Sequence, residues 1–172
     1  YDNFSSPAMQ NFVPTTYEGY AEGIIPANAS TYMIYQEGIY VGYKYYETRY
    51  FDAVMGNGNT AGYAAQYKNE VAFPFGYGLS YTDFEWSDFS VTEKNDIFTV
   101  RVTVKNVGNR AGKDVVQVYL QKPYTEHDKQ YGVETAAAEL VAFDKTQLLE
   151  PGAQETLTMS VDRRDFAKYD SY

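Results

Sequence analysis

A strict alternation of apolar and polar residues in the second half of the chain constrains its fold most. Between residues 98 and 104 every second residue is Phe or Val, and Thr and Arg stand between them. The same two-residue period recurs between residues 157 and 161. Because successive side chains of a β-strand point to opposite faces, this pattern indicates half-buried strands of an antiparallel sheet.

Short strands separated by turns predict a sandwich. Further strands are expected at residues 115–121 and 140–143, and turn-forming Asn, Gly and Pro residues lie at 106–112 and 149–152. The expected fold class is therefore mainly β, an antiparallel sandwich of the fibronectin type III or immunoglobulin type, preceded by an irregular segment. We count five strands, or six, from Trp86, whereas such a sandwich has about seven. The last strand is expected in a continuation of the chain.

An aromatic stretch at residues 71–84 comes just before the predicted strands. It combines three Phe, two Tyr and one Leu with Pro74, Gly76 and Gly78. Proline fixes its own φ and favours an extended residue before it, whereas glycine allows close backbone approach. We interpret this stretch as a buried, bent connector whose rings lie between two bodies.

The region before the connector gives weaker signals. Residues 39–46 alternate as a strand would. The same region also fits one face of a helix formed by Tyr35, Ile39, Gly42, Tyr43 and Tyr46. We expect a strand or bend at residues 37–41, then a short helix, with an ion pair between Glu37 and Lys44.

A cluster of Gly and Asn at residues 55–62 predicts that the whole of residues 51–70 is a long loop. Loops of this length often bind ligands or cover a site. Tyr63 and Tyr67 are its aromatic residues, so we predict that they contact the substrate. The alternative is a surface loop that binds nothing.

Charge and composition exclude several classes of partner. The net charge is −9, which argues against binding to nucleic acid or to an anionic membrane. The chain has no cysteine, and therefore no disulfide or thiolate site. Its only histidine, His127, lies between two acidic residues in a polar segment at residues 124–138, where we expect it to be solvated. We expect no metal, no cofactor and no membrane span, and composition leaves the cellular compartment open.

Three segments together resemble the later part of glycoside hydrolase family 3, the β-glucosidase-like enzymes. They lie at residues 35–46, 73–82 and 106–119. The most specific of them reads Phe73-Pro74-Phe75-Gly76-Tyr77-Gly78-Leu79-Ser80-Tyr81-Thr82. By this resemblance, residues 1–82 are the C-terminal segment of an α/β sandwich domain with a linker. Residues 83–172 are then a fibronectin type III-like domain that lacks its last strand.

The resemblance also implies what the chain does not carry. In this family the nucleophilic Asp lies in a catalytic barrel and the general acid/base Glu lies upstream of any residue here, so no catalytic residue is assigned. The expected role is that of a non-catalytic portion of a β-glycosidase that acts on terminal β-linked sugars, with this portion bracing the barrel. The chain alone is expected to be inactive. The expected partners are the remaining domains of the parent enzyme, and a β-linked oligosaccharide is a candidate ligand. The alternative function is a carbohydrate-binding or adhesion module.

Overall fold

The structure is a computed structural model that describes residues 15–16, 31–32, 38–57, 60 and 62–170. The chain forms two compact units, Tyr1–Ala72 and Phe73–Tyr172. The domain boundary predicted after residue 82 lies later in the chain, and the assignment of the two domains stays a prediction. None of the helices in the described residues is both long and apolar enough to span a membrane.

In the first unit, two helices replace most of the predicted loop. Helix α2 spans Tyr43–Met55 and helix α3 spans Tyr63–Glu70. The short helix expected after residue 41 is therefore confirmed, but the loop expected at residues 51–70 is wrong. Helix α2 ends after Met55 because the next residue, Gly56, adopts the left-handed conformation with a φ of 72°.

The remainder of this unit is described only in part. Strand β1, Thr15–Thr16, pairs with strand β2, Thr31–Tyr32, in antiparallel fashion. A turn at residues 38–39 precedes α2, which agrees with the predicted bend rather than a strand. The ion pair predicted for Lys44 involves Glu37, which lies outside the described residues.

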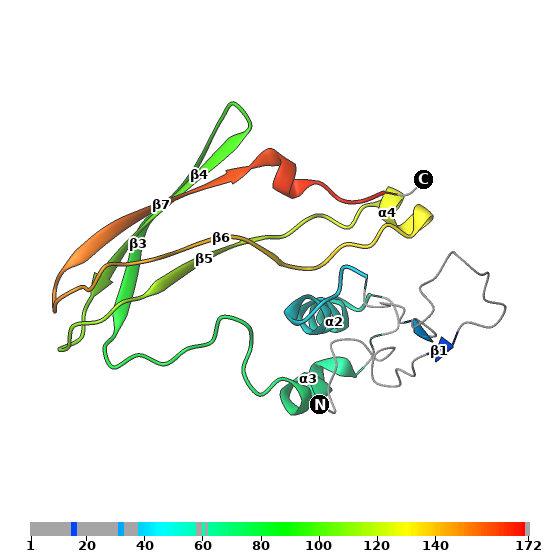
Figure 1. Ribbon diagram of the computed structural model, residues 1–172, viewed down its shortest axis with the longest axis horizontal. Coiled ribbons are helices and arrows are strands. Elements are labelled where there is room, and N and C mark those ends of the chain that lie inside the picture. The colour runs from blue at the N-terminus through cyan, green and yellow to red at the C-terminus, as the bar shows by residue number, and fades with distance from the viewer. Residues whose placement is uncertain (1–14, 17–30, 33–37, 58–59, 61, 171–172) are drawn as a thin grey trace. The chain divides into compact units, whose positions relative to one another are not determined.

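The second unit is the predicted antiparallel sandwich (Figure 1). One sheet has the strand order β3-β4-β7 and the other consists of β5 and β6. The strands are β3 Phe84–Lys94, β4 Ile97–Asn106, β5 Val115–Leu120, β6 Glu139–Lys145 and β7 Gln154–Asp162. Helix α4, Glu126–Tyr131, lies in the connection from β5 to β6, and the 3₁₀-helix η1, Arg163–Phe166, follows β7. The predicted mainly β fold class is therefore confirmed.

The core lies between the two sheets and follows the alternation in the sequence. Val100, Val102 and Val104 of β4 are buried, and so are Leu157 and Met159 of β7. In the register, Val100 lies opposite Met159 and Val102 opposite Leu157. Directly opposed residues of an antiparallel pair share one face, so these side chains form a continuous apolar layer.

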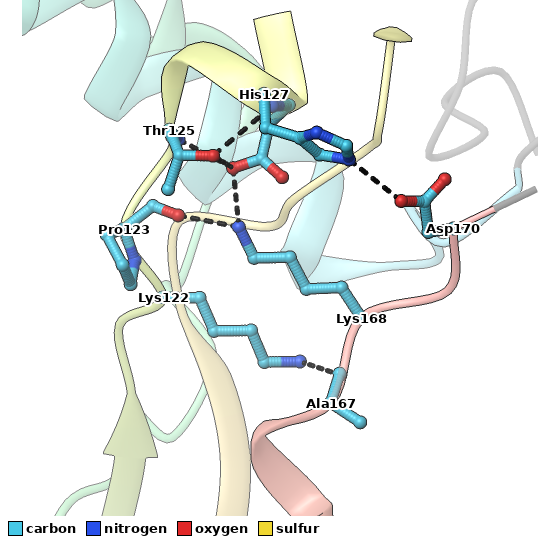
Figure 2. A network of polar contacts seen from close by, with 8 residues as sticks. Lys122, Pro123, Thr125, His127, Ala167, Lys168 and Asp170 are labelled. Carbon is cyan, nitrogen blue, oxygen red and sulfur yellow. Dashed lines mark hydrogen bonds and ion pairs between the residues drawn. The ribbon is translucent and has the colours of Figure 1, made fainter. Parts of the chain in front are cut away.

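The chain after β7 returns to the α4 segment and is held there by two lysines (Figure 2). Lys168 Nζ lies 2.7 Å from Asp128 Oδ2 and 2.6 Å from the carbonyl oxygen of Pro123. Lys122 Nζ donates to the carbonyl oxygen of Ala167 at 2.8 Å. The bond from Lys168 lowers the pKa of Asp128 to about 2, because the ammonium group favours the ionised carboxylate.

His127 lies on the exposed side of this segment. Its Nε2 atom is 2.9 Å from Asp170 Oδ2, and its side chain is 56% exposed. Figure 2 shows the ring on α4 and the carboxylate near the end of the described chain. The expected exposure of His127 is confirmed, and its contact is an ion pair at the surface when the ring is protonated.

Candidate functional site: the aromatic connector and its anchor

Residues 73–81 form the aromatic connector, and their large side chains lie at the surface. Phe73 is 69% exposed and Tyr77 54%, while Leu79 and Tyr81 reach 90% and 93%. The predicted burial of the connector is therefore wrong within this chain. The physical reason is that the closest approaches to the rest of the sandwich are made by Gly76 and by Thr82, which follows the connector, so the apolar rings are left outward.

The connector is nevertheless bent and held in place, as its Pro and Gly residues predicted. The amide of Tyr77 donates to the carbonyl oxygen of Pro74 at 3.0 Å, and the rings of Phe73 and Tyr77 stack at 5.0 Å. Gly76 has a φ of 84°, and a Cβ added there would lie 2.2 Å from Gln117 Oε1 of β5. The left-handed backbone favours glycine, and any larger residue would also force the Gln117 amide to move.

Asn106 anchors the end of the connector to the sandwich. Its side chain is fully buried. The Nδ2 group donates to the carbonyl oxygens of Arg110 and Leu149 at 2.7 and 2.8 Å. The Oδ1 atom accepts from Thr82 Oγ1 at 2.8 Å and from the amide of Gly108 at 3.1 Å. One amide side chain therefore joins the connector, the turn after β4 and the turn before β7.

Two glycines of the turn after β4 make room for Thr82. A Cβ added to Gly108 would lie 2.2 Å from Thr82 Oγ1, and one added to Gly112 would lie 2.6 Å from Thr82 Cγ2. The turn also donates two amide hydrogen bonds, from Val107 and Gly108, to the carbonyl oxygen of Asp83. The two motifs at residues 73–82 and 106–112 are therefore packed on each other, a relation that their separation in the sequence conceals.

An open groove of about 800 Å³ runs between the connector and the start of β5. It is lined by Tyr77 and Leu79 of the connector and by Trp86, Asp114 and other residues of the sandwich. The indole of Trp86 donates to Asp114 Oδ2 at 2.7 Å. The connector forms one wall of this groove. The only carboxylate among the lining residues, that of Asp114, already accepts the hydrogen bond from Trp86.

Tyr63 and Tyr67, the predicted substrate contacts, lie on α3 and bond to carboxylates. Tyr63 is only 2% exposed, and its hydroxyl donates to Glu70 Oε2 at 2.8 Å. The Tyr67 hydroxyl donates to Glu47 of α2, and its ring lies 4.7 Å from that of Tyr50. The Tyr63 bond lies within α3, whereas the Tyr67 contacts join α3 to α2. Substrate contact by either tyrosine stays a prediction.

Arg49 adds a cation to this helix pair. Its guanidinium carbon lies 4.7 Å from the centre of the Tyr63 ring, and its Nη1 donates to the hydroxyl of Tyr45 at 3.3 Å. Burial and the bond to Glu70 raise the pKa of Tyr63, and burial and the bond to Glu47 raise that of Tyr67. Both phenols therefore stay protonated at neutral pH and act as hydrogen-bond donors.

Two grooves of the second unit each contain a single carboxylate. The groove at the connector includes Asp114, and a second groove between β6 and β7 includes Asp144. Retaining glycoside hydrolysis needs two carboxyl groups about 5–5.5 Å apart on either side of the sugar. Each groove supplies one carboxylate, so neither has the pair that this chemistry requires.

A comparison with protein families identifies the type of domain that the second unit contains. The family model for the fibronectin type III-like domain matches residues 114–172. The second unit is therefore a β-sandwich of the fibronectin type III-like kind, as the strand pattern predicted.

Longer similarities extend over most of the chain. Over 141 residues it is 40% identical to thermostable β-glucosidase B of Acetivibrio thermocellus, covering 80% of this chain and 15% of that protein. A β-glucosidase of Ruminococcus albus is 42% identical over 137 residues, covering 80% and 12%. The solved structure of β-glucosidase 3B from Thermotoga neapolitana in complex with glucose superposes with a TM-score of 0.61 at 37% identity, covering 80% and 16%.

These similarities confirm the predicted resemblance: the chain is similar to β-glucosidases, among them one of glycoside hydrolase family 3, and carries a fibronectin type III-like domain. The glycoside hydrolase family 3 β-glucosidase of Bifidobacterium adolescentis also superposes, with a TM-score of 0.58 at 27% identity over 78% of this chain and 16% of that one. The chain spans between 12% and 16% of the length of each of these relatives.

Proposed function

We propose that this chain is a non-catalytic segment of a β-glucosidase, and that its connector docks against the remainder of that enzyme and braces the catalytic part. We refer to the longer polypeptide that would carry these residues as the parent enzyme. The observation that supports this role most strongly is the exposed row of apolar side chains at residues 73–81.

An exposed row of apolar side chains is unfavourable in water unless another surface covers it. Contiguous apolar patches on soluble proteins usually mark a contact surface. The connector is not a loosely tethered strip, because Asn106 bonds to Thr82 directly after it and Gly76 lies closely against Gln117 of β5. A surface that is apolar, exposed and fixed in shape is suited to binding a preformed partner with little loss of conformational entropy.

The relatives support the proposed activity of the parent enzyme. The similar proteins are named β-glucosidases, and each is several times longer than this chain. Two grooves of the second unit hold one carboxylate each, and we place the working pair in the part of the parent enzyme outside these residues. Its substrates would be terminal β-linked glucosides.

The first experiment compares hydrolysis of a chromogenic aryl β-glucoside by this chain and by the parent enzyme. The parent enzyme is expected to release the chromophore and the chain is not. Release by the chain alone would contradict the assignment of a non-catalytic segment. Titration of the chain with cello-oligosaccharides tests the alternative function, because saturable binding would favour a carbohydrate-binding module over a brace.

A second experiment tests the docking surface itself. Leu79→Ser in the parent enzyme is expected to destabilise the docked state by about 2 kcal/mol, the value for burying one leucine side chain, and to shorten the half-life of activity on heating. Leu148→Ser is the matched control, because Leu148 is an exposed leucine outside the connector. Equal half-lives for the two variants would contradict docking through the connector.

A further inference from the structure

The groove beside the connector has a floor formed by the outer face of β5. Val115, Gln117 and Tyr119 line the groove, whereas Val116 and Val118 between them pack in the core. Because side chains alternate along a strand, the three lining residues share one face. The connector forms a wall of the groove, and all of the lining residues belong to the second unit.

Two aromatic side chains of the groove are held by hydrogen bonds and remain open to solvent. The indole of Trp86 donates to Asp114 Oδ2 at 2.7 Å, and Trp86 is 52% exposed. The hydroxyl of Tyr119 donates to Gln117 Oε1 at 3.0 Å, and Tyr119 is 37% exposed. A ring that is already held in place loses little conformational entropy when a ligand packs on it. The groove therefore offers two preorganised apolar surfaces.

The charge of the groove differs in sign from that of the whole chain. The net charge of the chain is −9, but the charged residues that line the groove are Lys113, Lys145 and Asp114. The two oxygens of Asp114 already accept hydrogen bonds, from Trp86 and from the amide of Val115. Within the part of the chain that the structure describes, neither lysine has its ammonium group in an ion pair or a hydrogen bond. Two positive charges are therefore available to an anion.

Both lysines lie at the same end of the groove. Lys145 of β6 is opposite Val115 in the register, and directly opposed residues share a face. Lys113 precedes Val115 by two residues in the segment that leads into β5. Two hydrogen bonds hold this segment beside β6, since the Asp114 amide donates to Thr146 Oγ1 at 3.0 Å and the Thr146 amide donates to the Asp114 carbonyl at 2.9 Å.

From this arrangement we infer that the groove binds a saccharide that carries a carboxylate, the group that defines a uronic acid. The sugar ring packs on Trp86 and Tyr119, and the carboxylate pairs with Lys113 and Lys145. Ligand sites typically combine apolar surface with a few polar groups that fix the orientation of the ligand. An uncharged saccharide lacks the group that the lysines bind.

The choice of a saccharide rests on the proposed function, because an enzyme that hydrolyses β-glucosides encounters oligosaccharides. The two available lysines support a carboxylate on it by charge complementarity. The competing occupant is a carboxylate side chain of the parent enzyme, which the same lysines would bind. Titration and cross-linking separate the two.

Fluorescence of Trp86 is the direct readout, because Trp86 is the only tryptophan of the chain and lines the groove. The chain is titrated with a cello-oligosaccharide whose hydroxymethyl groups have been oxidised to carboxylates, and with the neutral oligosaccharide of equal length. The oxidised oligosaccharide is expected to change the fluorescence saturably, and the neutral one is not. Absence of a saturable change with the oxidised oligosaccharide, or equal affinity for both, would overturn the inference.

Two double variants test the lysines. Lys113→Gln combined with Lys145→Gln is expected to weaken binding of the oxidised oligosaccharide by about tenfold or more, because charge-assisted hydrogen bonds are lost. Lys94→Gln combined with Lys105→Gln is the matched control, since it removes the same charge outside the groove. It is expected to leave the affinity unchanged. Equal losses in the two double variants would overturn the inference, because binding would then depend on overall charge alone.

The double variants are expected to fold. All four lysines are exposed, and exposed substitutions away from specific contacts usually change stability little. Melting curves of both variants check this expectation before the titrations, and they should match the curve of the unmodified chain.

Carbodiimide cross-linking of the parent enzyme tests the competing occupant. The reagent joins an ammonium group and a carboxylate that lie in contact as an amide, which peptide mass spectrometry identifies. Lys113 and Lys145 are expected to form no such amide with acidic residues of the parent enzyme outside this chain. An amide between either lysine and one of those residues would assign the groove to a protein side chain and would overturn the inference.

Activity measurements separate this inference from the proposed function. If the parent enzyme hydrolyses the aryl β-glucoside but the chain does not bind the oxidised oligosaccharide, only the saccharide site is refuted. If the chain binds the oxidised oligosaccharide but the parent enzyme does not hydrolyse the glucoside, only the proposed activity is refuted.

Discussion

Asn106→Ala tests the anchor that joins the connector to the sandwich. The substitution removes four side-chain hydrogen bonds, to Thr82, Gly108, Arg110 and Leu149. A typical hydrogen bond contributes about 0.5–1.5 kcal/mol net, and buried groups left unpaired cost more. The Leu149 carbonyl keeps a bond from the amide of Gly112, which reduces the loss. The expected decrease in the free energy of unfolding is therefore about 3 kcal/mol.

For a domain of about 100 residues, a loss of this size corresponds to a fall in melting temperature of at least about 12 °C. The single tryptophan, Trp86, reports unfolding by fluorescence in urea or on heating. Asn109→Ala is the control, because Asn109 is an exposed residue of the same turn. A double-mutant cycle with Thr82→Val isolates the bond between Thr82 and Asn106. A loss below about 1 kcal/mol for Asn106→Ala, equal to that of Asn109→Ala, would refute the assignment of an anchor.

Three further substitutions test other contacts. Gly108→Ala is expected to destabilise the sandwich by about 2 kcal/mol in a urea titration, because the added methyl group would lie 2.2 Å from Thr82 Oγ1. Gly78→Ala is the control and is expected to be neutral, because a Cβ at Gly78 has nothing within 4 Å. Asp128 has a folded-state pKa lowered to about 2, so its stabilising contribution is present above about pH 4 and is lost as the pH falls toward 2. Lys168→Met should lower stability at neutral pH and flatten this acid dependence in melting curves, and an unchanged dependence would show that the pair is not its source. Tyr67→Phe removes the hydrogen bond to Glu47 and is expected to destabilise the helix pair by about 1 kcal/mol. Because the folded-state pKa of Tyr67 is raised, the unmodified chain loses stability above pH 10 and the variant should lose less. Circular dichroism of the helices measures both effects.

The sandwich could be predicted because its strands alternate strictly. Val100, Val102 and Val104 are buried as their spacing predicts, and the turns at residues 106–112 and 149–152 carry Gly, Asn and Pro. In such strands the hydrophobic period and the burial pattern are the same physical signal. The fold of this half therefore follows from local sequence.

The helices of the first unit could be predicted only in part. Tyrosine has an apolar ring and a polar hydroxyl, so a run of tyrosines hides the boundary between a buried face and an exposed one. The Gly and Asn residues near position 57 suggested that the loop continued to Glu70, although they form only the break between α2 and α3. The contact of Tyr67 with the carboxylate of Glu47 depends on how the two helices pack, which the sequence does not specify.

The connector shows a different limit. Its composition indicates an apolar segment with a fixed bend, and the bend at Pro74 and Gly76 is present. Composition does not reveal whether the surface that covers the rings belongs to the same stretch of chain. The anchoring role of Asn106 could not be predicted for a related reason. An Asn before a Gly-containing turn is usually interpreted as a turn residue, whereas two of its buried hydrogen bonds are with residues distant in the sequence, Thr82 and Leu149.

Solvent accessibility of the connector tests the central claim most directly. Hydroxyl-radical footprinting followed by mass spectrometry measures how fast the side chains of Phe73, Tyr77, Leu79 and Tyr81 are oxidised. In this chain they are expected to react at the rate of exposed residues, as their accessibility indicates. In the parent enzyme we predict strong protection of these residues and no change at Leu148. Equal oxidation of the connector in both proteins would contradict the account, because the rings would then have no surface to dock against.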